Sequence, residues 1–185
     1  MGMGKWFKEK WNNMQGGQVV HDFGVVSSGS KGTREVYRLK GKLRFGKWGW
    51  NLHLELDKDP NDSDSTMDSV NIYFNDPVEA MQVFEHAQGL ITSNQGPSGE
   101  SIGPISTRIL KLLGGEVVKH FGRIDNHPRG DSNNRVELAL VRRKGEYDFF
   151  VMVGSRARFD WPVQLIDDMR FMTQACGQLM NQYMG

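Results

Sequence analysis

A five-residue pattern occurs twice in this chain. Phe74-Asn75-Asp76-Pro77-Val78 returns as Phe159-Asp160-Trp161-Pro162-Val163, an offset of 85 residues. The apolar positions that follow keep the same offset, as in Phe84 and Met169, and their spacing is that of one face of a helix. A short polar residue followed by proline is typical of a helix N-terminus. The repeat therefore predicts two halves, each consisting of a β-sheet followed by a helix, in one α+β fold.

The composition indicates the class of protein and the compartment in which we expect it. A chain of 185 residues with 38% hydrophobic and 24% charged residues fits one globular domain. Its single cysteine, Cys176, lies on the expected apolar face of the last helix, where we predict a small core residue. One cysteine excludes an intrachain disulfide framework. No apolar run reaches the roughly 20 residues of a membrane span, and none fits a secretory signal. We expect the cytoplasm or another reducing intracellular compartment, without integral membrane insertion.

The domain organisation follows from the repeat. We expect an N-terminal amphipathic arm over residues 1–17 and a single domain over residues 18–185. Within that domain, halves at 18–91 and 105–185 are joined by a polar, Gly/Pro-rich linker at 92–104. The arm places aromatic residues on one helical side with lysines beside them. Packing of the arm on the body or on a partner is the first interpretation, and contact with a membrane surface or nucleic acid is the alternative.

Period-two alternation identifies the strands of the first half. We predict a strand over residues 19–27, a flexible loop over 28–32, and a hairpin with strands 37–45 and 50–56 about the turn Gly46-Lys47-Trp48-Gly49. An acidic connection over 57–68, a strand over 69–74 and a helix over 77–91 complete this half.

The second half has a similar order. We predict a helix over residues 105–121, in which Gly114-Gly115 is a candidate bend or end. A loop over 125–134 follows, then a hairpin with strands 135–142 and 147–154 about Lys144-Gly145, a short strand through Phe159, and a final helix over 162–183. Pairing about the turn places Leu140 opposite Phe149, so that one face of the hairpin is apolar. The apolar stripe of the final helix is too long for one half to cover. It therefore packs across both halves or against a second subunit, and we expect a homo-oligomer.

The outward face of the second hairpin is also apolar, with Ala139, Val141, Phe150 and Met152. A face exposed to water should be more polar, so we expect a neighbouring element or subunit to cover it. Base stacking on Phe150 is the alternative.

Basic residues project from one side of the first predicted hairpin. They alternate along its first strand, and further candidates lie at the hairpin tip: Arg34, Arg38, Lys40, Lys42, Arg44, Lys47 and Trp48. Cations for phosphates beside flat rings for bases are the chemistry that a single-stranded nucleic acid requires. Trp48 is the expected exposed stacking ring, whereas Trp50 alternates onto the apolar face. The turn of the second hairpin adds Arg142, Arg143 and Lys144 as further candidates.

The same hairpin has a second interpretation. If Phe45 pairs with Trp50, the same register places three basic residues opposite an acidic residue or histidine: Lys42 opposite His53, Lys40 opposite Glu55 and Arg38 opposite Asp57. Such cross-strand pairs are an ordinary way to solvate a sheet and contribute about 0.2–1 kcal/mol each.

No motif indicates catalysis, a cofactor or a metal. The acidic stretch at residues 57–68 departs from the calcium-loop pattern at its glycine and its final glutamate positions. The histidines and Cys176 do not form a metal-ligand spacing. We therefore expect a protein that is not an enzyme and that has no cofactor.

Two copies of an antiparallel sheet followed by a helix resemble the layout of the PC4, Whirly and Pur-alpha type single-stranded nucleic-acid-binding proteins. The resemblance rests on residues 37–56 and 69–91 in the first half and 135–180 in the second. In that group the sheets bind DNA or RNA and the helices hold the halves or subunits together. We expect sequence-tolerant binding of single-stranded DNA or RNA. The alternative is a non-enzymatic protein–protein interaction or structural subunit, whose partner would contact the second hairpin or the C-terminal helix.

Overall fold

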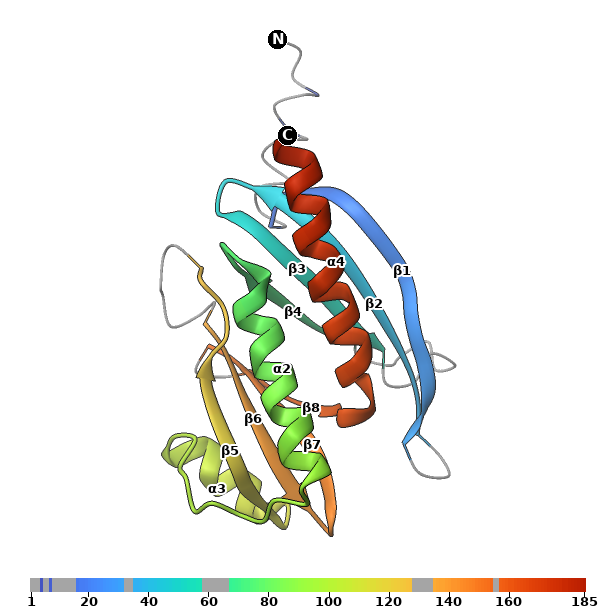
Figure 1. Cartoon of the computed structure of the whole chain (residues 1–185). Helices are drawn as coiled ribbons and strands as arrows, with labels where there is room; N and C mark the ends of the chain where they lie inside the picture. Colours follow the sequence, from blue (N-terminus) through green and yellow to red (C-terminus); the bar gives the residue numbers. More distant parts are fainter. Residues whose placement is uncertain are drawn as a thin grey trace.

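Two four-stranded antiparallel sheets form most of this α+β protein (Figure 1). The computed structural model describes residues 16–31, 35–57, 67–127, 135–154 and 157–185, together with Gly4 and Phe7. The first sheet consists of β1 (Gln18–Lys31), β2 (Glu35–Gly46), β3 (Gly49–Asp57) and β4 (Met67–Tyr73), in that order. The second consists of β5 (Gly115–Arg123), β6 (Val136–Arg143), β7 (Glu146–Val153) and β8 (Ala157–Pro162). The helices are α2 (Pro77–Thr92), α3 (Pro104–Leu112) and α4 (Ile166–Met184), the last preceded by a 3-10 turn at Val163–Leu165.

The predicted repeat is confirmed. In each half four strands are followed by a helix, and α2 and α4 lie side by side (Figure 1). Arg170 Nη2 lies 3.5 Å from Glu85 Oε1 across the two helices. These residues are separated by the repeat offset, so they occupy equivalent positions in the two halves. Contact between equivalent positions places them near a pseudo-two-fold axis that relates the halves.

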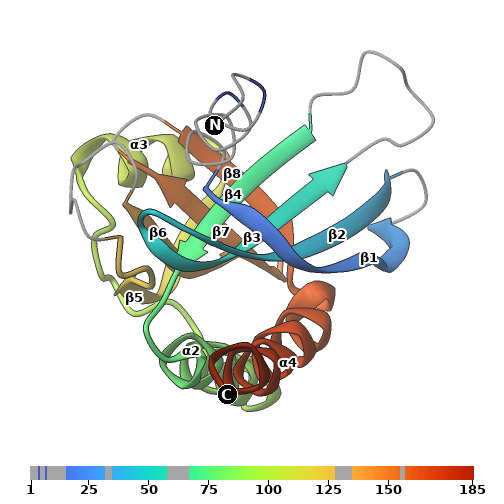
Figure 2. The same cartoon turned by 90° about the horizontal axis from the view of Figure 1, so that it is seen from above.

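Both halves share one hydrophobic core. The inner faces of the two sheets pack against α2 and α4, which lie on the same side of the sheets (Figure 2). Phe84 of α2 meets Phe149 of β7 with ring centres 6.4 Å apart, and Trp161 is almost fully buried. Each such side chain contributes roughly 1.5–3 kcal/mol through burial. Cys176 is a buried core residue as predicted, and burial raises the pKa of its thiol to about 12.

Both predicted hairpin registers are confirmed. In the first sheet Phe45 pairs with Trp50 and Lys42 with His53. In the second sheet Leu140 pairs with Phe149. Since side chains alternate between the two faces of a strand, these registers fix which residues face the core and which face outward.

The structure shifts several predicted boundaries, and at two places a predicted loop or helix is a strand. The predicted loop at residues 28–32 is strand as far as Lys31, because β1 stays paired with β2 to that point. The predicted helix at 105–121 ends at Leu112, and β5 begins at Gly115. Gly114 has a φ of 71°, in the left-handed region in which helices commonly end. Val117 therefore belongs to a strand that pairs with β6.

The two repeat helices begin differently. Asp76 caps α2, since its Oδ1 accepts a hydrogen bond from the Val78 backbone N–H at 2.9 Å. The second copy enters its helix through the 3-10 turn after Pro162 and has no side-chain cap there. Asp160 instead pairs with Arg143 at 3.3 Å. The capping expected from the repeated pattern thus holds for the first copy only.

The connection between the halves is irregular but packed on the second sheet. The Ser98 N–H donates to the Val117 carbonyl at 2.9 Å, and Glu100 Oε1 accepts from Lys119 Nζ at 2.9 Å. Three predicted features lie wholly or mostly outside the described residues. They are the arm, Arg34, and the acidic connection, of which residues 58–66 are not described. Among the helices that the structure describes, none is both long and apolar enough to cross a membrane.

Candidate nucleic-acid interface

The outward faces of the two sheets, turned away from α2 and α4, are covered to different extents. On the second sheet, α3 and the chain before it cover the outward face (Figure 2). Ile102 and Leu110 pack there against Ala139, Val141 and Phe150. The prediction that another element covers this apolar face is confirmed, and the element belongs to the same chain. Phe150 is 2% exposed, so base stacking on this residue is wrong.

The first sheet has a polar outward face with no such cover among the described helices (Figure 2). Arg38, Lys40, Lys42 and Arg44 occupy alternate positions of β2, and we refer to them as the basic row. The first three are half-buried, and the Lys42 side chain is 28% exposed. β2 is an inner strand of this sheet, so the basic row runs along the middle of the face.

A carboxylate and a histidine lie beside the basic row on β3. Glu55 Oε1 lies 2.9 Å from His53 Nε2 and 3.9 Å from Lys42 Nζ. His53 Nδ1 lies 2.6 Å from Asn71 Oδ1 on β4. Burial alone would raise the pKa of Glu55, but the His53 hydrogen bond and the charges of His53, Lys42 and Lys40 outweigh it and lower the pKa. Glu55 is therefore ionised at neutral pH and offsets part of the positive charge, as the second interpretation of the sequence required.

At the end of this face near the hairpin tip, neighbouring residues bury the last cation of the basic row. Arg44 and Tyr73 are each less than a tenth exposed, and Asn51 Nδ2 donates to the Gly16 carbonyl at 2.6 Å. Burial lowers the pKa of the Arg44 guanidinium, against the opposing effects of Glu55 and Tyr73. The predicted site residue Arg44 therefore lies inside the protein, below the surface formed by the other three cations.

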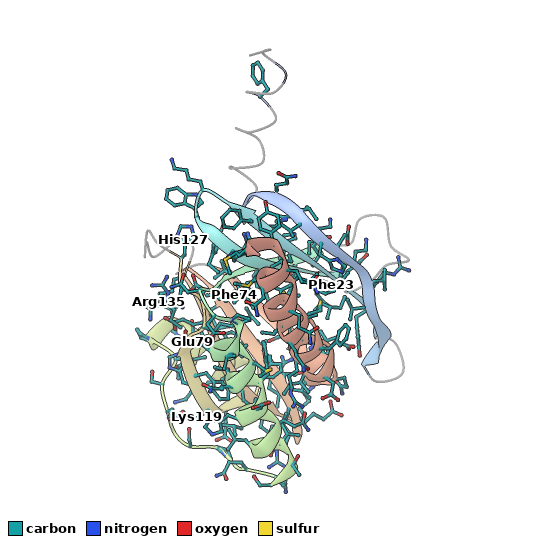
Figure 3. All side chains as sticks on the ribbon, turned by 45° about the horizontal axis from the view of Figure 1, so that its top comes forward. Phe23, Phe74, Glu79, Lys119, His127 and Arg135 are labelled. Carbon is teal, nitrogen blue, oxygen red and sulfur yellow. The ribbon has the colours of Figure 1, made fainter. Side chains whose placement is uncertain are left out.

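The hairpin tip contacts the second half. The ring centres of Trp48 and His127 are 5.6 Å apart, and Figure 3 shows His127 beside this end of the first sheet. His127 also meets Tyr73 edge-on, with ring centres 4.6 Å apart. Lys47 is exposed, and its Nζ lies 4.9 Å from the centre of the Trp48 ring. Trp48 is half-buried rather than fully exposed, and Trp50 is buried in the core as expected.

The basic turn of the second hairpin lies at the opposite end of the molecule (Figure 1). Arg143 donates to the buried Asp148 at 2.8 Å, and the Arg142 guanidinium lies 5.4 Å from the centre of the Tyr147 ring. Lys144 is exposed in the turn. The structure therefore does not bring Arg142, Arg143 and Lys144 together with the basic row, and Arg143 is engaged in a structural ion pair.

Sequence reasoning missed His127 and Tyr73 as neighbours of the hairpin tip. Tyr73 alternates with the apolar residues of β4, which indicates its outward position, but His127 lies in an irregular segment without periodicity. The Asn126 N–H donates to the Tyr73 carbonyl at 2.7 Å and holds this segment against β4. That long-range hydrogen bond, together with the ring contact to Tyr73, places His127 beside the hairpin tip.

The rest of the described surface contains a hollow of about 410 Å³ between the start of α3 and the second sheet. Its charged side chains pair with one another: Glu137 lies 3.2 Å from His120 Nε2 and also contacts Arg135. Within the described ranges, no group of three His, Cys, Asp or Glu side chains is arranged to hold a metal ion. Comparison of the chain with protein-family models and with curated proteins gave no match.

Proposed function

We propose that the protein binds single-stranded DNA or RNA, with little sequence preference, on the outward face of the first sheet. One observation supports this proposal above the others. Arg38, Lys40 and Lys42 form a half-exposed line on an inner strand, and this line leads to Lys47 and Trp48 at the hairpin tip. Cations in a line interact with successive phosphates, and a ring at the end of that line can stack on a base.

The proposal predicts salt-sensitive binding. Fluorescence anisotropy with labelled oligothymidylate and oligouridylate, at low and moderate salt, is the direct test. Replacing both Lys40 and Lys42 by alanine should weaken binding by about tenfold or more at low salt, because two phosphate contacts are lost. Lys111→Ala removes an exposed cation from α3, far from the basic row, and should leave the affinity unchanged. Absence of binding by the parent protein at low salt would rule out the proposal.

Trp48 tests the stacking part separately. A stacked base contributes about 1–3 kcal/mol, so Trp48→Ala should weaken binding by at least about fivefold. Its ring already contacts His127, so the folded fraction of the variant must be checked by thermal unfolding. Parent-like affinity in a folded Trp48→Ala variant would remove the stacking role and leave the phosphate contacts.

A second candidate function is a protein-interaction subunit, and one observation favours it. In α3, Ile105 is 64% exposed and Leu112 is 79% exposed, and Leu113 directly after the helix is 46% exposed. Exposed apolar residues on one helix are typical of a surface that another protein covers. Concentration-dependent association in sedimentation experiments, abolished by Leu112→Ser, would support this candidate. A monomeric protein that binds oligonucleotides would support the first.

A further inference from the structure

We infer that a bound single strand lies lengthwise along β2 and does not cross the strands of the first sheet. The inference rests on the proposed function, and it adds the direction and length of the bound segment. It follows from the arrangement of charges on the outward face.

Carboxylates lie on both strands that flank the basic row. On β1, Asp22 is opposite Lys42. On β3, Glu55 is opposite Lys40 and Asp57 is opposite Arg38. At each of these cations the paired residue is therefore a carboxylate on one flanking strand and a residue other than Asp or Glu on the other, while along β2 the charge stays positive.

A polyanion experiences these two directions differently. Neighbouring strands are about 4.8 Å apart, so a backbone that crosses the sheet at any of the three cations brings a phosphate against the carboxylate on one side of β2. The lowered pKa of Glu55 keeps one of these carboxylates charged. Along β2, cations follow one another at every second residue, about 6.6 Å apart. That spacing is comparable to the separation of neighbouring phosphates in an extended single strand.

The ends of the basic row limit the length of the bound segment. Arg44 is 8% exposed, so the accessible part of the row consists of Arg38, Lys40 and Lys42. Beyond Arg44 the half-buried Trp48 ring lies at the tip. Three phosphates on three cations, with one base reaching the tip, correspond to a footprint of about four nucleotides, at the short end of known single-strand sites.

The footprint can be measured with an oligothymidylate length series from two to twelve nucleotides. Affinity should rise to about four nucleotides and then increase only slowly with the number of equivalent positions. The logarithm of the association constant should fall with the logarithm of salt with a slope of about −2, as expected for three phosphates. A steep rise beyond eight nucleotides, or a slope beyond about −4, would overturn the inference while leaving the proposed function intact. Failure of the parent to bind the twelve-nucleotide probe would overturn both.

The direction can be measured with hexathymidylates that have a photo-crosslinking base at one end. A lengthwise path places one labelled end at the turn between Gly46 and Gly49 and the other near Arg38 or Asp57. A transverse path would place the crosslinks on the exposed outward residues of the edge strands, such as Val25 on β1 and Ser69 on β4. Crosslinks of the second kind, mapped by mass spectrometry, would overturn the inference.

A charge variant tests the cause of the direction. Glu55→Gln combined with Asp57→Asn removes the carboxylates on β3 and retains the cations. It should tighten binding of the hexanucleotide by severalfold and add crosslinks on β3 and β4. Unchanged affinity and an unchanged crosslink pattern in this variant would mean that the flanking carboxylates do not direct the strand.

Discussion

The two repeats share one backbone plan but differ on the faces of their sheets that point away from the common core. In the second repeat, Val141 and Phe150 face outward, and α3 covers them. In the first repeat, Lys40 and Lys42 face outward at a comparable place in the sheet, and no described helix covers them. A helix such as α3 needs apolar residues beneath it, and the basic row offers none. One fold thus has a face that α3 covers and a face that no described helix covers, which we call the open face, and the outward side chains of the two sheets differ accordingly.

The same contrast applies to the basic residues of the two hairpins. Arg143 is paired with Asp148 and Asp160, so its charge serves the second sheet itself. Lys42 has a single carboxylate neighbour among its described salt bridges, at 3.9 Å, which it shares with His53. A cation that forms short ion pairs with two carboxylates is less available to a ligand than a cation with one distant carboxylate that also pairs with another residue. Basic residues in a hairpin therefore indicate a binding surface only where the structure leaves them accessible.

The largest expected effect comes from truncating the covered face. Phe150→Ala should lower the free energy of unfolding by about 3–5 kcal/mol, because it leaves a cavity between the second sheet and α3. Lys40→Ala, on the open face, should change it by less than about 0.5 kcal/mol. Urea denaturation of both variants makes the comparison. Equal losses would mean that the first sheet is also covered in solution.

Next in size is the ion pair of the second hairpin. Asp148 is 2% exposed, and Asp148→Asn would leave the half-buried Arg143 without its main charged partner, although Asp160 remains. We expect a loss of about 2 kcal/mol in the free energy of unfolding, measured with urea. Oligonucleotide affinity, measured on the same folded variant, should not change. A clear gain in affinity would show that Arg143 belongs to the binding surface after all.

The third effect tests the difference between the two helix starts. Asp76→Ala removes the N-cap of α2 and should lower the free energy of unfolding by about 1 kcal/mol. The neighbouring Asn75 is exposed and is not the cap, so Asn75→Ala serves as the control, with a change below about 0.5 kcal/mol. Thermal unfolding monitored by circular dichroism is sufficient to resolve this difference. Similar losses in both variants would refute the capping role.

The features predicted from sequence are those with local causes. Alternation and turn residues fix both hairpin registers, and the repeated pattern predicts that β4 leads into α2 as β8 leads into α4. The helix predicted over 105–121 ends at Leu112, just before the candidate end at Gly114-Gly115, although Val117 continues its apolar spacing. Pairing with β6 determines that this segment is a strand, and such long-range pairing leaves no local signal.

The arrangement of the candidate site could be predicted only where it depends on local sequence. Alternation correctly placed the basic row on the outward face, since that depends on β2 alone. It could not reveal the burial of Arg44, because the closed end of the face is built from Gly16, Tyr73 and His127, which are distant in sequence. It also could not reveal that Arg142 to Lys144 lie at the far end of the molecule (Figure 1).

The smallest expected effect distinguishes a carboxylate that only stabilises the fold from one that also influences oligonucleotide binding. Glu55 on β3 and Glu100 in the connection between the halves both have a lowered pKa. Burial opposes that shift at Glu55, where His53 and the two lysines outweigh it. At Glu100 the main cause is the Lys119 hydrogen bond. A carboxyl with a lowered folded-state pKa stabilises the fold above its ordinary pKa of about 4.3, and this contribution is lost as pH falls below that value.

Glu55→Gln and Glu100→Gln should therefore each reduce the loss of stability between about pH 5 and pH 3. At neutral pH each substitution should change the free energy of unfolding by no more than about 1 kcal/mol, because both side chains are partly exposed. Only Glu55→Gln should also tighten oligonucleotide binding at pH 7, by about two- to threefold, because only Glu55 lies beside the basic row. Urea titrations across this pH range and anisotropy at pH 7 measure the two effects. If Glu100→Gln tightens binding as much as Glu55→Gln does, the gain reflects net charge, and the open face of the first sheet has no special part in it.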